Sequence, residues 1–255
     1  MNKGQVTIWI ILGIFLVAAM ILFFMLGDKP EINVPPEEDL VFDMQGYLDI
    51  CTQDSVEEVV DLVLLQGGFV DPVNYVDFND GKVEYICENI GFYDPCIQQH
   101  PMLLQEIKEE IRKNVVTKVG RCFSDFEKEV RDRGGRIDSS IALPEVAINL
   151  GEDRLWVNIK KEVVISLGDE TRQFKEFDFD LRSPVYNLAM IAMEIAAQEA
   201  EYCYFEYVGY HVLYPRYEIK PYFMSDPTVI YTIIDTKSEK SMNIAIRSCA
   251  IPAGV

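Results

Sequence analysis

Histidine and tryptophan are scarce in this sequence of 255 residues, which contains only two of each. Because histidine is the most frequent general acid or base near neutral pH, two histidines leave few arrangements for such catalysis. The sequence also lacks the GxSxG, HExxH and P-loop motifs, and no GxGxxG follows an expected strand. These absences predict a non-catalytic protein without a cofactor or metal. A membrane-tethered hydrolase is the lesser alternative, because two of the 42 acidic residues could pair as in glycosidases.

Basic residues are outnumbered, with 23 Lys and Arg against 42 Asp and Glu and a net charge of −19. Residues 30–81 contain thirteen acids and no Lys or Arg. Such a surface repels nucleic acid and anionic lipid headgroups, whereas cations and basic partners suit it. The acids are scattered and match no loop with calcium-ligand spacing, which favours a solvated acidic surface over a calcium site.

One long run of the sequence, Gly4 to Gly27, carries no charge. In a helix these positions span about 36 Å, enough to cross a hydrocarbon core of about 30 Å. The run is too long for a cleaved secretory signal, so it predicts a retained membrane helix over residues 5–27 in contact with lipid. Lys3 precedes it, and Lys29 is the only base for fifty residues after it, which favours a cytoplasmic N-terminus and an extracellular C-terminal domain.

The start of the chain, Lys3-Gly4-Gln5 followed by the uncharged run, resembles the class III signal sequence of archaeal type IV pilins and archaellins. The resemblance covers residues 1–27. It implies that a prepilin peptidase cuts after Gly4, and that the helix beginning at Gln5 packs against pilin-like subunits in a filament or surface complex. Bacterial pilins carry a glutamate five residues after the cut, where this chain has Trp9, so the likeness is to the archaeal proteins. A plain, uncleaved signal anchor is the alternative.

All six cysteines follow the uncharged run, and an even number in an external domain predicts three disulfides. The shortest pair brackets a turn-forming segment with Gly91 and Asp94-Pro95, and the longer pairs would join helices or fasten the C-terminal hairpin. Buried free thiols and a zinc site are the alternatives, although the sequence has no CxxC and its histidines match no ligand spacing. Six cysteines allow fifteen connectivities, of which the sequence favours only the pair Cys87 with Cys96, while Cys51 with Cys122 and Cys203 with Cys249 are longer pairings that stay open.

Residues 37–255 are expected to form one α+β domain after a leader (1–4), the membrane helix (5–27) and a proline-containing stalk (28–36). The domain divides into a helical half (37–135) and a sheet-rich half (136–255). Helical periodicity predicts helices over 37–65, over 25–30 residues from Pro101, and over 184–207, with a break in the first near Ser55, where Ser55 and Glu58 match a capping box. Strands occur in blocks, which favours an antiparallel sheet in an α+β fold. The expected strands are 75–78 and 82–86 around Asn79-Asp80-Gly81, a meander of 141–150, 154–167 and 171–181, and a hairpin of 229–235 and 241–248.

Two features of the expected strands bear on sites. Phe174, Phe177 and Phe179 do not fall on one face of a regular strand, so a bulge or burial on both faces is required. Asp178 and Asp180 share a face and could hold a cation, but solvent-facing acids on a half-buried strand explain them better.

Seven tyrosines fall between Tyr202 and Tyr222, in a segment interrupted by prolines. Such a segment is typical of a surface that binds glycan or protein, or of a loop packed on its own domain. We therefore take Tyr207, Tyr210 and Tyr214 as candidate recognition residues. The function predicted from the sequence is a pilin-like subunit of a surface filament or complex, and the alternative is an uncleaved receptor or adhesin. The ligand is unknown.

Overall fold

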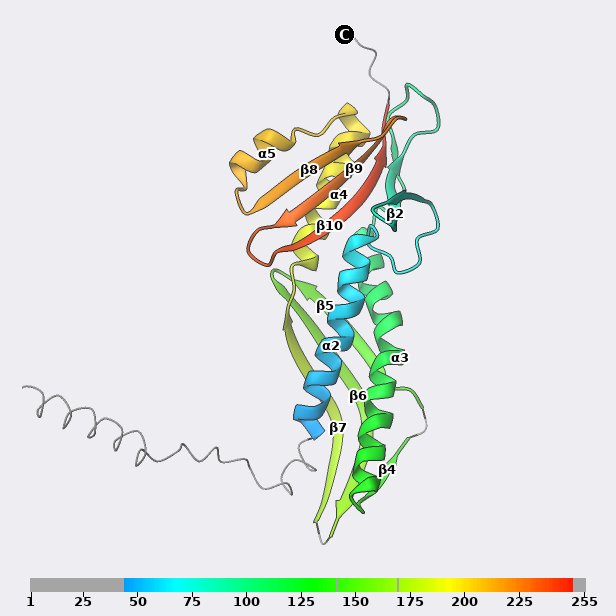
Figure 1. The fold of residues 1–255 in the computed structure, drawn as a ribbon, viewed down its shortest axis with the longest axis vertical. Coiled ribbons are helices and arrows are strands. Elements are labelled where there is room, and N and C mark those ends of the chain that lie inside the picture. Colours follow the sequence, from blue (N-terminus) through cyan, green and yellow to red (C-terminus); the bar gives the residue numbers. More distant parts are fainter. Residues whose placement is uncertain (1–43, 141, 169, 250–255) are drawn as a thin grey trace, which may run out of the picture. The chain divides into compact units, whose positions relative to one another are not determined.

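The computed structural model describes residues 44–140, 142–168 and 170–249 (Figure 1). The predicted leader, including Lys3, Gly4 and Gln5, the membrane helix and the stalk lie outside these ranges. Within the described residues, no helix combines the length and the hydropathy needed to cross a membrane. The fold is α+β, as predicted, and it contains two sheets.

The first sheet contains six strands and is called the mixed sheet. Its main path runs β1-β2-β10-β9-β8. β3 pairs with Cys87 and Glu88 of β2, beyond the residues of β2 that pair with β1. β10 lies parallel to β2, with Ala245 opposite Tyr85, and the other pairs are antiparallel. This parallel pair corrects the expectation of a wholly antiparallel sheet, because β10 returns from the end of the domain to lie beside β2. The strands are β1 (Tyr75–Phe78), β2 (Gly81–Glu88), β3 (Ile97–Gln98), β8 (Tyr217–Phe223), β9 (Thr228–Asp235) and β10 (Lys240–Arg247).

The second sheet is antiparallel and is built around the long strand β6 (Arg154–Leu167). β7 (Glu170–Arg182) pairs along one edge of β6, while β5 (Glu145–Gly151) and β4 (Arg136–Ser139) share the other edge. The predicted meander is thus confirmed, although β5 begins later than expected and β4 was not predicted.

The second sheet contains a bulge next to Phe174, Phe177 and Phe179, which could not all fall on one face of a regular strand. The β6–β7 register shifts between Lys160 and Val163. Phe174 stacks on Phe177 with 5.9 Å between ring centroids, and Phe177 and Phe179 are both buried. The extra residue lies in β6, opposite Lys175 of β7, and all three rings lie against the core, with Phe174 half-buried, so a bulge is found where one was predicted.

Within the described residues, the sheets are accompanied by four helices: α2 (Met44–Leu65), α3 (Leu103–Asp132), α4 (Val185–Tyr202) and α5 (Tyr207–Leu213). α2 and α3 lie side by side over the antiparallel sheet, and α4 packs against the mixed sheet on strands β9, β10 and β2 (Figure 1). α2 passes through Ser55 without the expected break, because the Ser55 hydroxyl donates to the Cys51 carbonyl within the helix at 2.7 Å. α4 ends at Tyr202 and not at the predicted Tyr207, since Cys203 turns the chain with a left-handed φ of 55°.

One hydrophobic core joins α2, α3 and α4 to both sheets. The predicted stripe of α3 is confirmed from Ile107 to Phe126, where every fourth or third residue is fully buried. α4 contributes small residues, Ala189, Ala192 and Ala196, which allow its backbone to lie close to the sheet. Because this packing holds the ends of α4 and β10 in place, it positions the site described next.

Candidate functional site

Four connecting segments meet at one end of the mixed sheet, which we call the loop end. They are the β2–β3 loop (89–96), the α4–α5 turn (203–206), the β8–β9 turn (224–227) and the residues after β10 (248–249). The β2–β3 loop is fastened there because the Asn89 backbone N–H donates to the Arg247 carbonyl and the Asn89 side chain donates to the Ser248 carbonyl, both at 2.8 Å. In Figure 1 these segments lie at the top of the view.

A hollow of about 360 Å³ opens at the loop end. Its floor is polar and buried, and is made by Glu199, Thr228, Tyr231 and Ser248. Its rim is exposed and largely aromatic, with Tyr204, Phe223 and Asp226. The Cys203–Cys249 disulfide lines one wall and ties the end of α4 to the residue after β10. Two of the elements that bound the hollow, α4 and the residues after β10, are therefore covalently joined.

Glu199 is the buried carboxylate of this floor, with 3% of its surface exposed. It lies in the last turn of α4, on the face that packs against β9, where the Tyr231 hydroxyl donates to its Oε1 at 2.5 Å. Burial raises the pKa of the Glu199 carboxyl, and the bond from Tyr231 opposes this effect. Burial and the neighbouring Glu199 likewise raise the pKa of Tyr231. The pair places one acceptor, held by a hydroxyl and not by a cation, at the bottom of the hollow.

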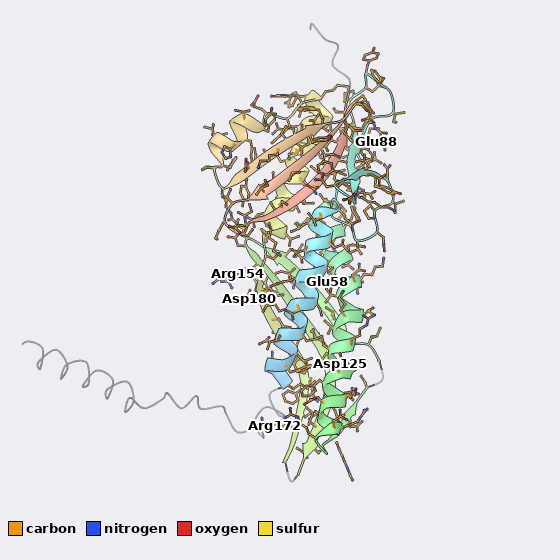
Figure 2. All side chains as sticks on the ribbon, viewed as in Figure 1. Glu58, Glu88, Asp125, Arg154, Arg172 and Asp180 are labelled. Carbon is orange, nitrogen blue, oxygen red and sulfur yellow. A yellow bond between two sulfur atoms is a disulfide. The ribbon has the colours of Figure 1, made fainter. Side chains whose placement is uncertain are left out.

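Asp226 is the second carboxylate, at the rim. Its two oxygens accept from the Thr228 backbone N–H at 3.2 Å and the Thr228 hydroxyl at 3.0 Å, which fixes the β8–β9 turn. Arg247 approaches Asp226 at 3.6 Å, but it is engaged by Glu88 at 2.7 Å and donates to the Tyr85 hydroxyl at 2.6 Å. Figure 2 shows Glu88 at this end of β2. Arg247 therefore supports the turn from β10 and is not part of the hollow's lining.

The β2–β3 loop displays large apolar side chains beside this hollow. Ile90, Phe92 and Tyr93 are 87%, 59% and 70% exposed, and the last two rings meet edge-on at 5.2 Å. The Cys87–Cys96 disulfide closes the loop at its base. Exposed apolar side chains on a covalently closed loop are typical of recognition surfaces, because little conformational entropy is lost when they bind.

Of the three tyrosines selected from the sequence, the structure brings Tyr210 and Tyr214 into contact and places only Tyr207 in the lining of the hollow. Tyr207 lines the hollow. Tyr210 packs between Phe205 and Tyr214, with ring centroids 5.5 and 4.8 Å away, and burial raises its pKa. Tyr214 is exposed on the far side of that contact and is absent from the lining of the hollow.

Sequence reasoning missed Glu199, Tyr231, Phe223 and the β2–β3 loop. One signal for Glu199 was present: it continues the apolar stripe of α4 from Leu188 through Ala192 and Ile195 at helical spacing. An acid in such a stripe must be buried with a partner. The sequence also contains the apolar residues between Cys87 and Cys96, which are the signal for the β2–β3 loop.

The remaining chemical groups lie elsewhere. His100 contacts Glu106 at 2.5 Å and Glu84 at 3.6 Å at the entry to α3, and His211 lies against the Tyr217 carbonyl at 3.0 Å. Neither histidine lines the hollow. Asp178 and Asp180 are exposed, and Asp180 pairs with Arg154 (Figure 2). In the described part of the chain, no three His, Cys, Asp or Glu side chains come together as a metal site.

The disulfides join Cys51 to Cys122, Cys87 to Cys96 and Cys203 to Cys249, so the number of disulfides and the short pair are as expected, and the structure adopts the two longer pairings that the sequence left open. Two of them frame the loop end. A rigid, partly aromatic hollow with a buried acceptor is suited to binding a polar group with an apolar stem. Comparison of the whole chain with protein-family models, with curated proteins and with solved structures finds no match.

Proposed function

We propose that this chain is a membrane-anchored cell-surface protein whose domain lies outside the cell and binds a partner at the loop end of the mixed sheet. The observation that carries the proposal is the set of three disulfides. Disulfides persist in oxidising compartments and are rare in the cytosol. The uncharged run from Gly4 to Gly27 supplies the anchor in this proposal.

Binding is favoured over catalysis by the chemistry of the loop end. The described lining of the hollow contains no histidine, and its two cysteines are joined to each other, so neither is a free nucleophile. What the loop end does offer is preformed shape: a closed loop with three exposed apolar side chains beside a hollow with a buried carboxylate.

The location is tested by labelling intact cells with a membrane-impermeant thiol reagent. Two single-cysteine additions form a matched pair, Asp54→Cys on the exposed side of α2 and Asn2→Cys before the uncharged run. We expect Asp54→Cys to be labelled from outside, Asn2→Cys to be labelled only after lysis, and the six native cysteines to be oxidised. Labelling of Asp54→Cys only after lysis, or six reduced native thiols, would overturn the proposal.

A pilin-like subunit is the second candidate function, favoured by Lys3-Gly4-Gln5 directly before the uncharged run. Here the helix serves assembly in addition to anchoring. Mass spectrometry of the native protein should then find Gln5 as the first residue, and Gly4→Val should block this processing while Gly27→Val should not. A native chain that begins at Met1 rejects this candidate and leaves the first proposal standing.

A further inference from the structure

The charges around the hollow at the loop end are unbalanced. Its lining contains two carboxylates, Glu199 and Asp226, and among the described lining residues none is basic. Three of the lining residues are tyrosines: Tyr204, Tyr207 and Tyr231. The lining therefore presents acceptors and aromatic rings, while Arg247, outside the lining, lies 3.6 Å from Asp226 and donates to the Thr228 hydroxyl at 3.2 Å.

Glu199 is the buried carboxylate of the two. A buried carboxylate is stabilised best by an opposite charge, whereas the partners of Glu199 in the hollow are the hydroxyls of Tyr231 and Ser248. A cation that entered the hollow would supply the missing charge. Aromatic faces also attract cations.

Other ligand charges fit less well. An anion would be repelled by Asp226 and would oppose ionisation of Glu199, a neutral sugar supplies no charge for either carboxylate, and a cation favours the ionised form of both. Arg247 offsets only part of the local charge, since it is already bound to Glu88 at 2.7 Å. The net charge of −19 favours the approach of basic ligands at a distance.

We infer that the hollow binds a primary ammonium group, presented by a lysine side chain of a partner protein. Glu199 and Asp226 are the anionic acceptors, and the rings of Tyr204 and Tyr207 surround the alkyl stem and the charge. The hollow lies at the lower end of the roughly 300–1,000 Å³ range of ligand pockets, which suits a single long side chain. The exposed Ile90 and Phe92 on the adjacent loop would contact the surface that carries this lysine. The inference names the partner chemistry of the proposed function and rests on it.

Calorimetric titration of the full chain in non-ionic detergent micelles tests the inference with three probes. They are acetyl-Gly-Lys-Gly-amide, the same peptide acetylated on the lysine Nζ, and cadaverine. We expect the lysine peptide to bind at least tenfold more tightly than its acetylated form, because acetylation removes the charge, and more tightly than cadaverine. Equal affinities for the two peptides would overturn the inference. Tighter binding of cadaverine would overturn the assignment to a protein side chain.

Two substitutions locate the binding. Glu199→Gln should lower the affinity for the lysine peptide at least tenfold. The control is Glu201→Gln, because Glu201 is an exposed acid on the same helix that does not line the hollow; it should change this affinity less than twofold. Asp226→Asn is the second variant, needed if Glu199→Gln alters the thermal midpoint. Unchanged binding by both hollow variants would sink the inference. If Asp54→Cys is labelled on intact cells but the lysine peptide does not bind, the lysine site is rejected while the location of the domain outside the cell is retained.

Discussion

Arg216 holds Asp153 through two hydrogen bonds, although Asp153 lies in the β5–β6 turn of the antiparallel sheet and Arg216 directly precedes β8 of the mixed sheet. The bond from Nη1 to Oδ2 measures 3.0 Å. The same guanidinium donates to Asp235 at the end of β9, from Nε at 2.7 Å and from Nη2 at 2.8 Å. The Asp235 side chain is fully buried. One planar, five-donor group therefore couples the two sheets.

Replacing Arg216 with methionine should lower the free energy of unfolding by about 3 kcal/mol, because Asp235 would be left as a buried carboxylate without its charge partner. Arg216→Lys should recover only part of the loss, since lysine cannot donate in the same forked geometry. Urea unfolding followed by circular dichroism measures both. Arg154→Ala, which removes the exposed pair with Asp180, is the control and should cost less than about 1 kcal/mol. A similar cost for both arginines would show that Arg216 does not couple the sheets.

The acid stability of the domain should depend on Asp153. Hydrogen bonds from Arg216 and Lys237 lower its pKa from the ordinary 3.8 to about 2. Because the folded pKa lies below the unfolded one, the ionised carboxylate stabilises the fold above about pH 4, and this contribution is lost as the pH falls toward 2. The thermal midpoint of the wild type should therefore fall more between pH 5 and pH 2 than that of Asp153→Asn. Asp54→Asn, which removes an exposed acid elsewhere, should follow the wild-type curve, and parallel curves for all three proteins would contradict the assignment.

The disulfides should contribute different amounts to the free energy of unfolding, according to the lengths of the loops that they close. Cys51 and Cys122 are 71 residues apart, and Cys87 and Cys96 only 9. If restriction of the unfolded chain dominates, removing the first pair by double alanine substitution should cost about 4 kcal/mol and removing the second about 2.5 kcal/mol. Urea unfolding of the two variants measures the difference. Equal costs would mean that native packing, not loop closure, determines the stabilisation.

Two glycines with the same left-handed backbone separate conformational strain from contact. Gly67 and Gly134 have φ values of 77° and 82°, but a Cβ on Gly67 would lie 3.0 Å from the Glu84 backbone nitrogen, whereas nothing lies within 4 Å of one on Gly134. Gly134→Ala should cost about 1 kcal/mol from φ alone, and Gly67→Ala at least about 1 kcal/mol more. Calorimetric thermal unfolding of the two variants tests this. A smaller loss for Gly67→Ala would show that the α2–β1 connection adjusts freely.

Much of the fold follows from local sequence. The stripe of α3 from Ile107 to Phe126 repeats at helical spacing, and Asn79-Asp80-Gly81 forms the expected turn, with φ values of 47° and 62° at Asn79 and Asp80. The bulge in the antiparallel sheet was one of two solutions required by the spacing of Phe174 and Phe177. In each case the determining interactions lie within a few residues.

The parts that sequence did not predict depend on contacts between distant segments. No local pattern shows that β10 inserts between β2 and β9, because hydrophobic alternation gives the face of a strand but not its neighbour. β8 includes Pro221, which is tolerated because β8 is an edge strand. The loop end could not be predicted from the sequence, since Glu199, Asp226 and the β2–β3 loop meet only when β10 lies beside β2.

The central place of β10 has a consequence for biosynthesis. A nascent chain emerges from its N-terminus, so β2 is available long before its neighbour has been translated. Until residues 240–247 emerge, β2 and β9 each expose an unpaired edge, and the mixed sheet cannot close. Long-range pairing of this kind slows folding and prolongs the exposure of aggregation-prone edges. The domain is thus expected to acquire its structure after most of it has left the ribosome, and chaperones that shield strand edges should raise its yield.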